Sequence, residues 1–172
     1  PKRRWNGKDR TFKLRVSGKS DSTFNSCPGT HRSTTGGNVD LEETPVVCLS
    51  QGQKFVALSM TEAELYAAVV VAQYMMYVMP FLEFLCLQVE KPMVLEIDNK
   101  GCIDLINNWS VAGRTRHIDC RKHFMRELKE EETMVFHWVK GKLNSSDMFT
   151  KNLEEKDFKK HAKHYVGDNE YM

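Results

Sequence analysis

Residues 59–68 read SMTEAELYAA and mark a point where a strand gives way to a long helix. They follow the run KFVAL, whose β-branched and aromatic residues favour a strand. Ser59 or Thr61 can cap the helix, because a hydroxyl there accepts a hydrogen bond from the first free N–H groups. Glu62 and Glu64 suit the positive end of the helix dipole. The stretch therefore predicts a strand-to-helix junction with two acidic side chains at its mouth.

The helix that follows is apolar on nearly every side, so the sequence predicts that it is buried. A carboxylate at the mouth of a buried helix is costly unless a cation pairs with it, and a bound metal is one such cation. The run Leu65–Leu87 is also long enough to cross a bilayer. Gln73, Pro80 and Glu83 interrupt it, so we expect two buried helical pieces broken near Pro80, with Phe81 in the core.

Composition places the chain among ordinary globular domains. Its 172 residues are 41% hydrophobic and 28% charged, which is enough for one domain with a core. We expect a basic flexible arm over residues 1–10, the domain over 11–165 and a polar tail over 166–172. The basic arm favours a polyanionic partner. Five scattered cysteines without Cys-x-x-Cys spacing indicate reduced thiols, and hence an intracellular protein.

The apolar patterning predicts an α/β fold with a mixed sheet, because early strands are followed by helices that alternate with further strands. A loop is expected over Asn25–Gly37, which is rich in Ser, Thr, Pro and Gly. The expected strands are Thr11–Lys19, Asn38–Glu42, Pro45–Leu49, Lys54–Leu58, Met93–Ile97 and Thr133–Lys140. Besides the long helix, helices are expected over Cys102–Ile106, over Arg116–Glu131 and from Met148 onward, with Asn144–Asp147 as the cap.

Four acids fall at the ends of predicted elements: Asp21, Glu64, Asp98 and Asp147. Helix capping alone explains acids in such places. Ligand sites, however, gather at the carboxyl ends of strands in α/β sheets, so these side chains could converge. Their repulsion would then require divalent cations, and hard oxygen ligands select Mg²⁺ or Mn²⁺. Two such ions can activate a water and stabilise the leaving oxygen of a phosphoryl displacement.

Five motifs recur in order along the chain: VALSMTEAELY at 56–66, DNKGCI at 98–103, RTRHID at 114–119, HFMRE at 123–127 and DMFTK at 147–151. Together they resemble the ribonuclease H domain of copia-type LTR retrotransposon polyproteins, and the resemblance covers roughly residues 12–158. A further motif, WVKG at residues 138–141, resembles the strand before the last catalytic acid of cellular type 1 ribonucleases H.

The resemblance implies an RNase H-like fold, with a five-stranded mixed sheet flanked by helices. It implies cleavage of the RNA strand of RNA–DNA hybrids during reverse transcription, with two Mg²⁺ ions for which Mn²⁺ can substitute. The catalytic and metal-binding acids map onto Asp21, Glu64, Asp98 and Asp147. Asp21 and Asp98 would bridge the ions. Glu64 is preferred over Glu62 because Glu-Leu-x-Ala matches the helix motif of the cellular enzymes.

The resemblance also implies partners and a place in the cell. The partners are the RNA–DNA hybrid and the reverse transcriptase part of the same polyprotein, with no membrane and a monomeric isolated domain. The location is the cytoplasm, in a virus-like particle, or the nucleus. Selectivity for RNA would come from 2′-hydroxyl contacts, for which the backbone and Ser22, Asn99 or Glu64 are candidates. Phosphates would be held by Arg114, Arg116, Arg121 and Lys122, and His117 is either a structural residue or a further phosphate contact.

The chain departs from the family at the first acid. The family reads SDADWA there, whereas residues 20–25 read SDSTFN, so a second acid and a tryptophan are missing. This departure supports a different class of function, a catalytically degenerate module that binds hybrid or scaffolds the polymerase without cutting. Another nuclease or an integrase of the same superfamily is a third reading, disfavoured because those proteins lack the motifs around Thr61–Tyr66 and Arg116–Asp119.

Overall fold

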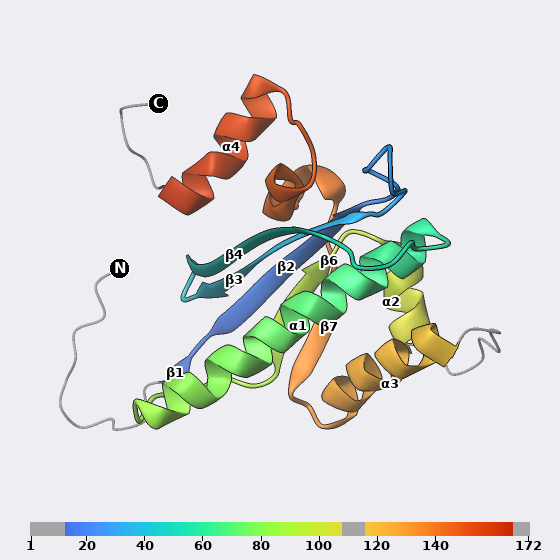
Figure 1. Ribbon diagram of the computed structural model, residues 1–172. Coiled ribbons are helices and arrows are strands. Elements are labelled where there is room, and N and C mark those ends of the chain that lie inside the picture. Colours follow the sequence, from blue (N-terminus) through green and yellow to red (C-terminus); the bar gives the residue numbers. More distant parts are fainter. Residues whose placement is uncertain (1–12, 108–115, 167–172) are drawn as a thin grey trace.

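The computed structural model describes residues 13–107 and 116–166, which form a mixed β-sheet with helices packed against it (Figure 1). The expected arm over 1–10 and nearly all of the expected tail lie outside the described residues. The strands are β1 (Lys13–Leu14), β2 (Val16–Thr23), β3 (Thr34–Leu41), β4 (Thr44–Gly52), β5 (Gln88–Val89), β6 (Met93–Ile97) and β7 (Met134–Trp138). The α-helices are α1 (Met60–Phe84), α2 (Lys100–Asn107), α3 (Arg116–Glu130) and α4 (Glu155–Val166), and the 3₁₀ helices are η1 (Gly141–Leu143) and η2 (Ser145–Phe149).

The main sheet has five strands in the order β4-β3-β2-β6-β7, which confirms the expected mixed sheet. The neighbours β2–β3 and β3–β4 are antiparallel, whereas β2–β6 and β6–β7 are parallel. In the parallel pair β2–β6, Ser20 lies opposite Ile97. The residues that follow each of them, Asp21 and Asp98, therefore lie side by side toward the carboxyl ends of these two parallel strands. This register is what brings two of the predicted acids together.

Helix α1 begins with a reciprocal cap. The hydroxyl of Ser59 accepts a hydrogen bond from the N–H of Glu62 at 3.1 Å, and Glu62 Oε2 accepts one from the N–H of Leu58 at 2.8 Å. The arrangement resembles a capping box, with the glutamate reaching the residue before Ser59 instead of Ser59 itself, and it fixes both the first residue of the helix and the direction from which the chain enters it. Leu65 and Met75 are fully buried against the sheet, so the first part of α1 forms much of the core.

The expectation of a break near Pro80 is wrong, because α1 continues without interruption to Phe84. Pro80 lies on the exposed side, where a carbonyl that loses its helical partner can bond to water instead. Phe81 is not in the core either: Tyr77, Phe81 and Phe84 are all exposed, Phe84 to 83%. Among the described helices, α1 alone is long and apolar enough to span a membrane, but half of its most apolar window is buried inside the protein.

Residues Lys54–Leu58 do not form a strand, which corrects another expectation. They turn away from the sheet edge after β4 and lead directly into the cap of α1. Phe55 packs under the guanidinium group of Arg121, whose Cζ atom lies 4.5 Å from the ring centroid. The buried Gln53 donates hydrogen bonds to the Thr35 hydroxyl at 3.1 Å and to the Ala63 carbonyl at 3.0 Å. Side-chain packing, rather than ladder pairing, therefore fixes this segment.

Strand β3 starts inside Asn25–Gly37, the segment for which the sequence predicts a loop. Its two glycines, Gly36 and Gly37, favour a loop by composition, yet they lie within a strand of the main sheet because of how neighbouring elements pack. A Cβ atom on Gly36 would clash with Thr150, the residue after η2, and one on Gly37 would clash with Val71 of α1. The two residues face opposite sides of the strand, so glycine lets a layer pack closely on each face of β3.

Helix α4 and η2 form the layer on the other face from α1 (Figure 1). The chain after Asn144 is not one helix from Met148, as the sequence predicts, but the short η2 followed by α4. His164 Nε2 lies 2.9 Å from Asp40 Oδ2 in β3, and the Tyr165 hydroxyl donates to Asn38 Oδ1 at 3.1 Å. These contacts hold α4 against β3.

Candidate metal centre

Three of the four predicted acids converge near the carboxyl ends of β2 and β6. Asp21, Glu64 and Asp98 each offer a carboxylate oxygen, and these oxygens lie within 4.8 Å of one another. They come from β2, from the first turns of α1 and from the residue after β6. Asp21 is 1% exposed and Glu64 5% exposed, so the cluster is largely buried. An open hollow of about 450 Å³ begins at these carboxylates and is also lined by Ser22, Asn99 and Lys151, among others.

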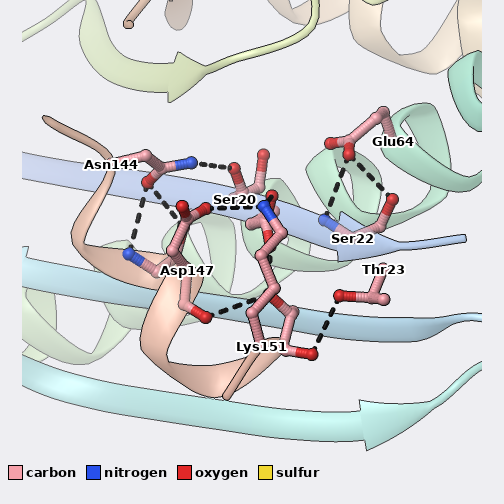
Figure 2. Close-up of polar contacts among 10 residues, drawn as sticks. Ser20, Ser22, Thr23, Glu64, Asn144, Asp147 and Lys151 are labelled. Carbon is pink, nitrogen blue, oxygen red and sulfur yellow. Dashed lines mark hydrogen bonds and ion pairs between the residues drawn. The ribbon is translucent and has the colours of Figure 1, made fainter. Parts of the chain in front are cut away.

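Only one of the two carboxylate oxygens of Glu64 has hydrogen-bond partners among the described residues. Its Oε1 atom accepts hydrogen bonds from the N–H of Ser22 at 3.2 Å and from the Ser22 hydroxyl at 2.9 Å (Figure 2). Its Oε2 atom is buried and has no hydrogen-bond partner among the described residues. Burial, together with the charges of Asp21 and Asp98, raises the pKa of Glu64 to about 8. Glu62, in contrast, is used by the helix cap, which agrees with the preference for Glu64.

Asp21 is held from the opposite side by the segment after η2. The Thr150 hydroxyl donates to Asp21 Oδ2, and the Lys151 ammonium donates to Asp21 Oδ1 at 3.1 Å. Burial raises the pKa of Asp21 to about 6, although both of these contacts act to lower it. Burial also raises the pKa of Asp98, while Lys151 acts in the opposite direction. All three clustered carboxyls thus resist ionisation when no cation is bound.

Asp147, the fourth predicted acid, is linked to the cluster through the side chain of Lys151. Its Oδ1 atom accepts a hydrogen bond from Lys151 Nζ at 3.0 Å (Figure 2). The same ammonium therefore contacts Asp21 and Asp147, and the Asp21 charge is the main reason that the pKa of Lys151 is raised despite its partial burial. The sequence reasoning did not single out Lys151. Its spacing of four residues from Asp147 is the signal that could have found it.

Two further residues position the acids and were also missed. The Asn144 side chain donates to the Ser20 carbonyl at 2.9 Å, and its Oδ1 accepts from the N–H and hydroxyl of Ser146, at 3.3 and 2.6 Å (Figure 2). This fully buried amide ties η2, and with it Asp147, to β2. Trp138 Nε1 donates to the Asp98 carbonyl at 3.0 Å, which ties the end of β6 to β7.

The residues expected to contact nucleic acid have different positions. Ser22 and Asn99 line the hollow, as candidates for substrate contact should. Ser22 also holds Glu64, and Asn99 Oδ1 accepts from the N–H of Cys102 at 2.9 Å, which caps α2. Each therefore has a structural task at the edge of the candidate site.

The basic residues expected to contact phosphates lie in other surroundings than Ser22 and Asn99. Arg121 is stacked on Phe55 and Tyr66, with its Cζ atom 4.5 and 4.9 Å from their ring centroids. Lys122 is only 4% exposed. The Arg121 guanidinium thus stacks on two rings while part of the residue stays exposed, whereas Lys122 is buried. Arg114 lies outside the described residues. Arg116 and His117 begin α3, but their side chains are not among those described.

Comparison with known sequences finds relatives among transposon polyproteins. Over 109 residues, 63% of the chain, the protein is 38% identical to the retrovirus-related Pol polyprotein from transposon TNT 1-94 of Nicotiana tabacum. Over 130 residues, 76% of the chain, it is 29% identical to the retrovirus-related Pol polyprotein from transposon RE1 of Arabidopsis thaliana. The matched segments make up only 8% and 9% of these polyproteins. No protein-family profile matches the chain.

Comparison with solved structures finds ribonucleases H. LC11-RNase H1, isolated from compost, matches with a TM-score of 0.57 at 12% identity, covering 78% of this chain and 91% of that one. The N-terminal RNase H domain of a Mycobacterium tuberculosis protein matches with a TM-score of 0.57 at 13% identity, covering 88% and 98%. LC11-RNase H1 has also been solved in complex with an RNA/DNA hybrid. The chain thus has the ribonuclease H fold and is homologous to a segment of the retrovirus-related Pol polyproteins of plant transposons.

Proposed function

We propose that this protein is a metal-dependent endoribonuclease that cleaves the RNA strand of RNA–DNA hybrids during retrotransposon reverse transcription. The observation that carries the proposal is the convergence of Asp21, Glu64 and Asp98 at the mouth of an open hollow. The ribonuclease H fold and the transposon relatives support it independently. In this setting the polymerase part of the same polyprotein is the natural partner, the separate domain is a monomer, and the protein acts inside the cell.

The residues fit a hard divalent cation. The donors are carboxylate oxygens alone, which suit Mg²⁺ or Mn²⁺. The buried, unpartnered Oε2 atom of Glu64 is the sharpest sign, because a buried acceptor without a donor is expected where a cation binds. Asp21, Glu64 and Asp98 would hold the metal, with Asp147 completing a two-ion site. Ions of this kind lower the pKa of a bound water and stabilise a leaving phosphate oxygen.

The protein's own residues prepare the site for substrate. Ser22 fixes one oxygen of Glu64, while the other oxygen is buried and has no hydrogen-bond partner among the described residues. Trp138 and Asn144 hold the backbone beside Asp98 and Asp147. Hybrids present 2′-hydroxyl groups in a wide, shallow minor groove, and Ser22 and Asn99 stand where such groups would enter the hollow. Fixed positions of this kind reduce the reorganisation needed during the reaction.

A cleavage assay tests the proposal. The protein is incubated with RNA–DNA hybrid labelled on the RNA strand, in Mg²⁺ or Mn²⁺, beside an Asp98→Asn variant. Asp104→Asn is the matched control, because Asp104 is an exposed acid on α2 outside the cluster. Cleavage by the parent and the control, but not by Asp98→Asn, is the expected result. Cleavage that persists in Asp98→Asn would refute the role of the cluster.

A second candidate function is a catalytically degenerate module that binds hybrid or scaffolds the polymerase. Two observations favour it: the changed sequence after Asp21, and the engagement of both Asp21 oxygens by Thr150 and Lys151. The same assay separates the two functions when hybrid binding is measured alongside it. Binding of hybrid without cleavage in either metal would support the module and overturn the nuclease.

A further inference from the structure

Lys151 occupies a position that an ordinary surface lysine does not. Its ammonium group lies between two acids of the candidate site, 3.1 Å from Asp21 Oδ1 and 3.0 Å from Asp147 Oδ1. The Asp21 side chain is 1% exposed and that of Asp147 14%, whereas Lys151 itself is 38% exposed. The positive charge thus reaches in from solvent to two carboxylates that are largely buried (Figure 2).

We propose that Lys151 is a built-in counter-ion that stands between Asp21 and Asp147 in place of a second divalent ion and must be displaced before Asp147 can join a metal site. This inference rests on the proposed metal-dependent function and concerns how the same site fills. It makes the binding of two ions a stepwise process, in which the first ion meets Lys151 only at Asp21 and the second competes with Lys151 at both Asp21 and Asp147.

The contacts explain the order of the two steps. Within the described residues, the hydrogen bonds of Lys151 go to Asp21 and Asp147, and none goes to Glu64 or Asp98. An ion can therefore enter beside the free Oε2 atom of Glu64 while the ammonium stays in place. An ion between Asp21 and Asp147 would meet the ammonium directly, because both cations would contact the same two oxygens and would repel each other at that distance.

The ammonium group of Lys151 can also move away from the two carboxylates. Its long side chain is partly exposed and follows Thr150 at the end of η2, so the ammonium can move into the solvent without unpacking the core. Lys151 lines the hollow, so the displaced ammonium stays at its rim, where it can meet an anionic substrate. Displacement would thus transfer its charge from the carboxylates toward the substrate.

Another pair in the same region provides a matched comparison. Lys159 contacts Glu155 at 2.7 Å with the same four-residue spacing, but Glu155 is 80% exposed. Such an exposed pair is worth little, and its removal leaves the candidate site unchanged. Lys159→Met therefore controls for the loss of one positive charge and of one lysine pair near α4.

The test is a Mn²⁺ titration by isothermal calorimetry and electron paramagnetic resonance on the parent, Lys151→Met and Lys159→Met. The parent is expected to bind one ion tightly and a second weakly. In Lys151→Met the second ion should bind about tenfold more tightly, because a competing charge-assisted contact is gone. Lys159→Met should match the parent. A purely structural role for Lys151 predicts the opposite sign, since a disturbed site would bind ions more weakly.

Two measurements keep the result clear if Lys151→Met folds poorly. Lys151→Gln retains a polar side chain without the charge and should show the same tightening. In the parent, crystals soaked in Mn²⁺ should show anomalous scattering beside Asp147 with the Lys151 ammonium moved away. Unchanged or weaker second binding in both variants, or an ion beside Asp147 with Lys151 in place, overturns the inference while the proposed function stands. Absence of ion binding in every protein overturns both.

Discussion

Replacing Glu64 with Gln tests the electrostatic cost of the acidic cluster. Burial, reinforced by the charges of Asp21 and Asp98, raises the pKa of the Glu64 carboxyl from 4.5 to about 8. An acid with a higher pKa in the folded state costs that state nothing below pH 4.5 and the full amount above about pH 8. The stability of the metal-free protein should therefore fall as the pH rises through this window.

The size of the effect follows from the pKa difference. Each pKa unit corresponds to about 1.4 kcal/mol, so the shift of Glu64 amounts to roughly 3–5 kcal/mol at alkaline pH. Gln keeps an oxygen for the Ser22 contacts and puts a neutral N–H donor in place of the buried, unpartnered Oε2 atom. Glu64→Gln should therefore raise the free energy of unfolding of the metal-free protein by about 2–4 kcal/mol near pH 8.5 and change it little near pH 5.

The assay is urea unfolding followed by circular dichroism, at about pH 5 and about pH 8.5, in EDTA and in saturating Mg²⁺. Glu62→Gln is the control, because Glu62 is also buried in the first turn of α1 but serves the cap. It should lose up to about 1 kcal/mol at both pH values. Mg²⁺ should stabilise the parent and leave Glu64→Gln unchanged. The reasoning fails if Glu64→Gln in EDTA is no more stable than the parent at the higher pH, or gains equally at both.

Three further changes should behave as follows. Asn144→Ala removes the buried tether to Ser20 and should lower the free energy of unfolding by about 2 kcal/mol and weaken Mn²⁺ binding, measured by denaturation and calorimetry. Gly37→Ala adds a Cβ atom 2.9 Å from the Lys19 carbonyl oxygen and into Val71, and should cost about 1–3 kcal/mol by the same denaturation. Phe84→Lys changes an exposed ring and should leave the unfolding free energy within about 0.5 kcal/mol; a larger loss would show that the ring is packed.

Much of the fold could be predicted because local patterning and packing agree. The apolar run Met93–Ile97 and the cap at Ser59 each indicate one element, and each is present. The strand expected over Thr11–Lys19 is instead divided into β1, which pairs with β5, and β2, which continues to Thr23 in the main sheet. The errors arose where tertiary contacts decide. Lys54–Leu58 has strand-forming residues, but no strand is available to pair with it after the chain leaves β4. Pro80 is a helix breaker by propensity, yet its exposed position lets α1 continue.

The acidic residues of the candidate site could be predicted from the sequence, but the positions of its basic residues could not. Carboxylates at strand and helix ends are visible in sequence, and the fold brings three of them together. Arg121 and Lys122 belong to a basic stretch that favours phosphate binding, but only the coordinates show that Arg121 stacks on Phe55 and that Lys122 is buried. Lys151 lies in a motif that was noticed, yet its contact with Asp21, 130 residues away in sequence, needs coordinates.

The tether from Asn144 to Ser20 has a consequence for the protein as it is being made. It joins the last acidic element to the first strand of the main sheet, so the acidic pocket is complete only after the residues of η2 have left the ribosome. A nascent chain that has released β2, α1 and β6 still lacks η2. Such a chain is therefore expected to expose an incomplete acidic cluster until η2 docks on β2.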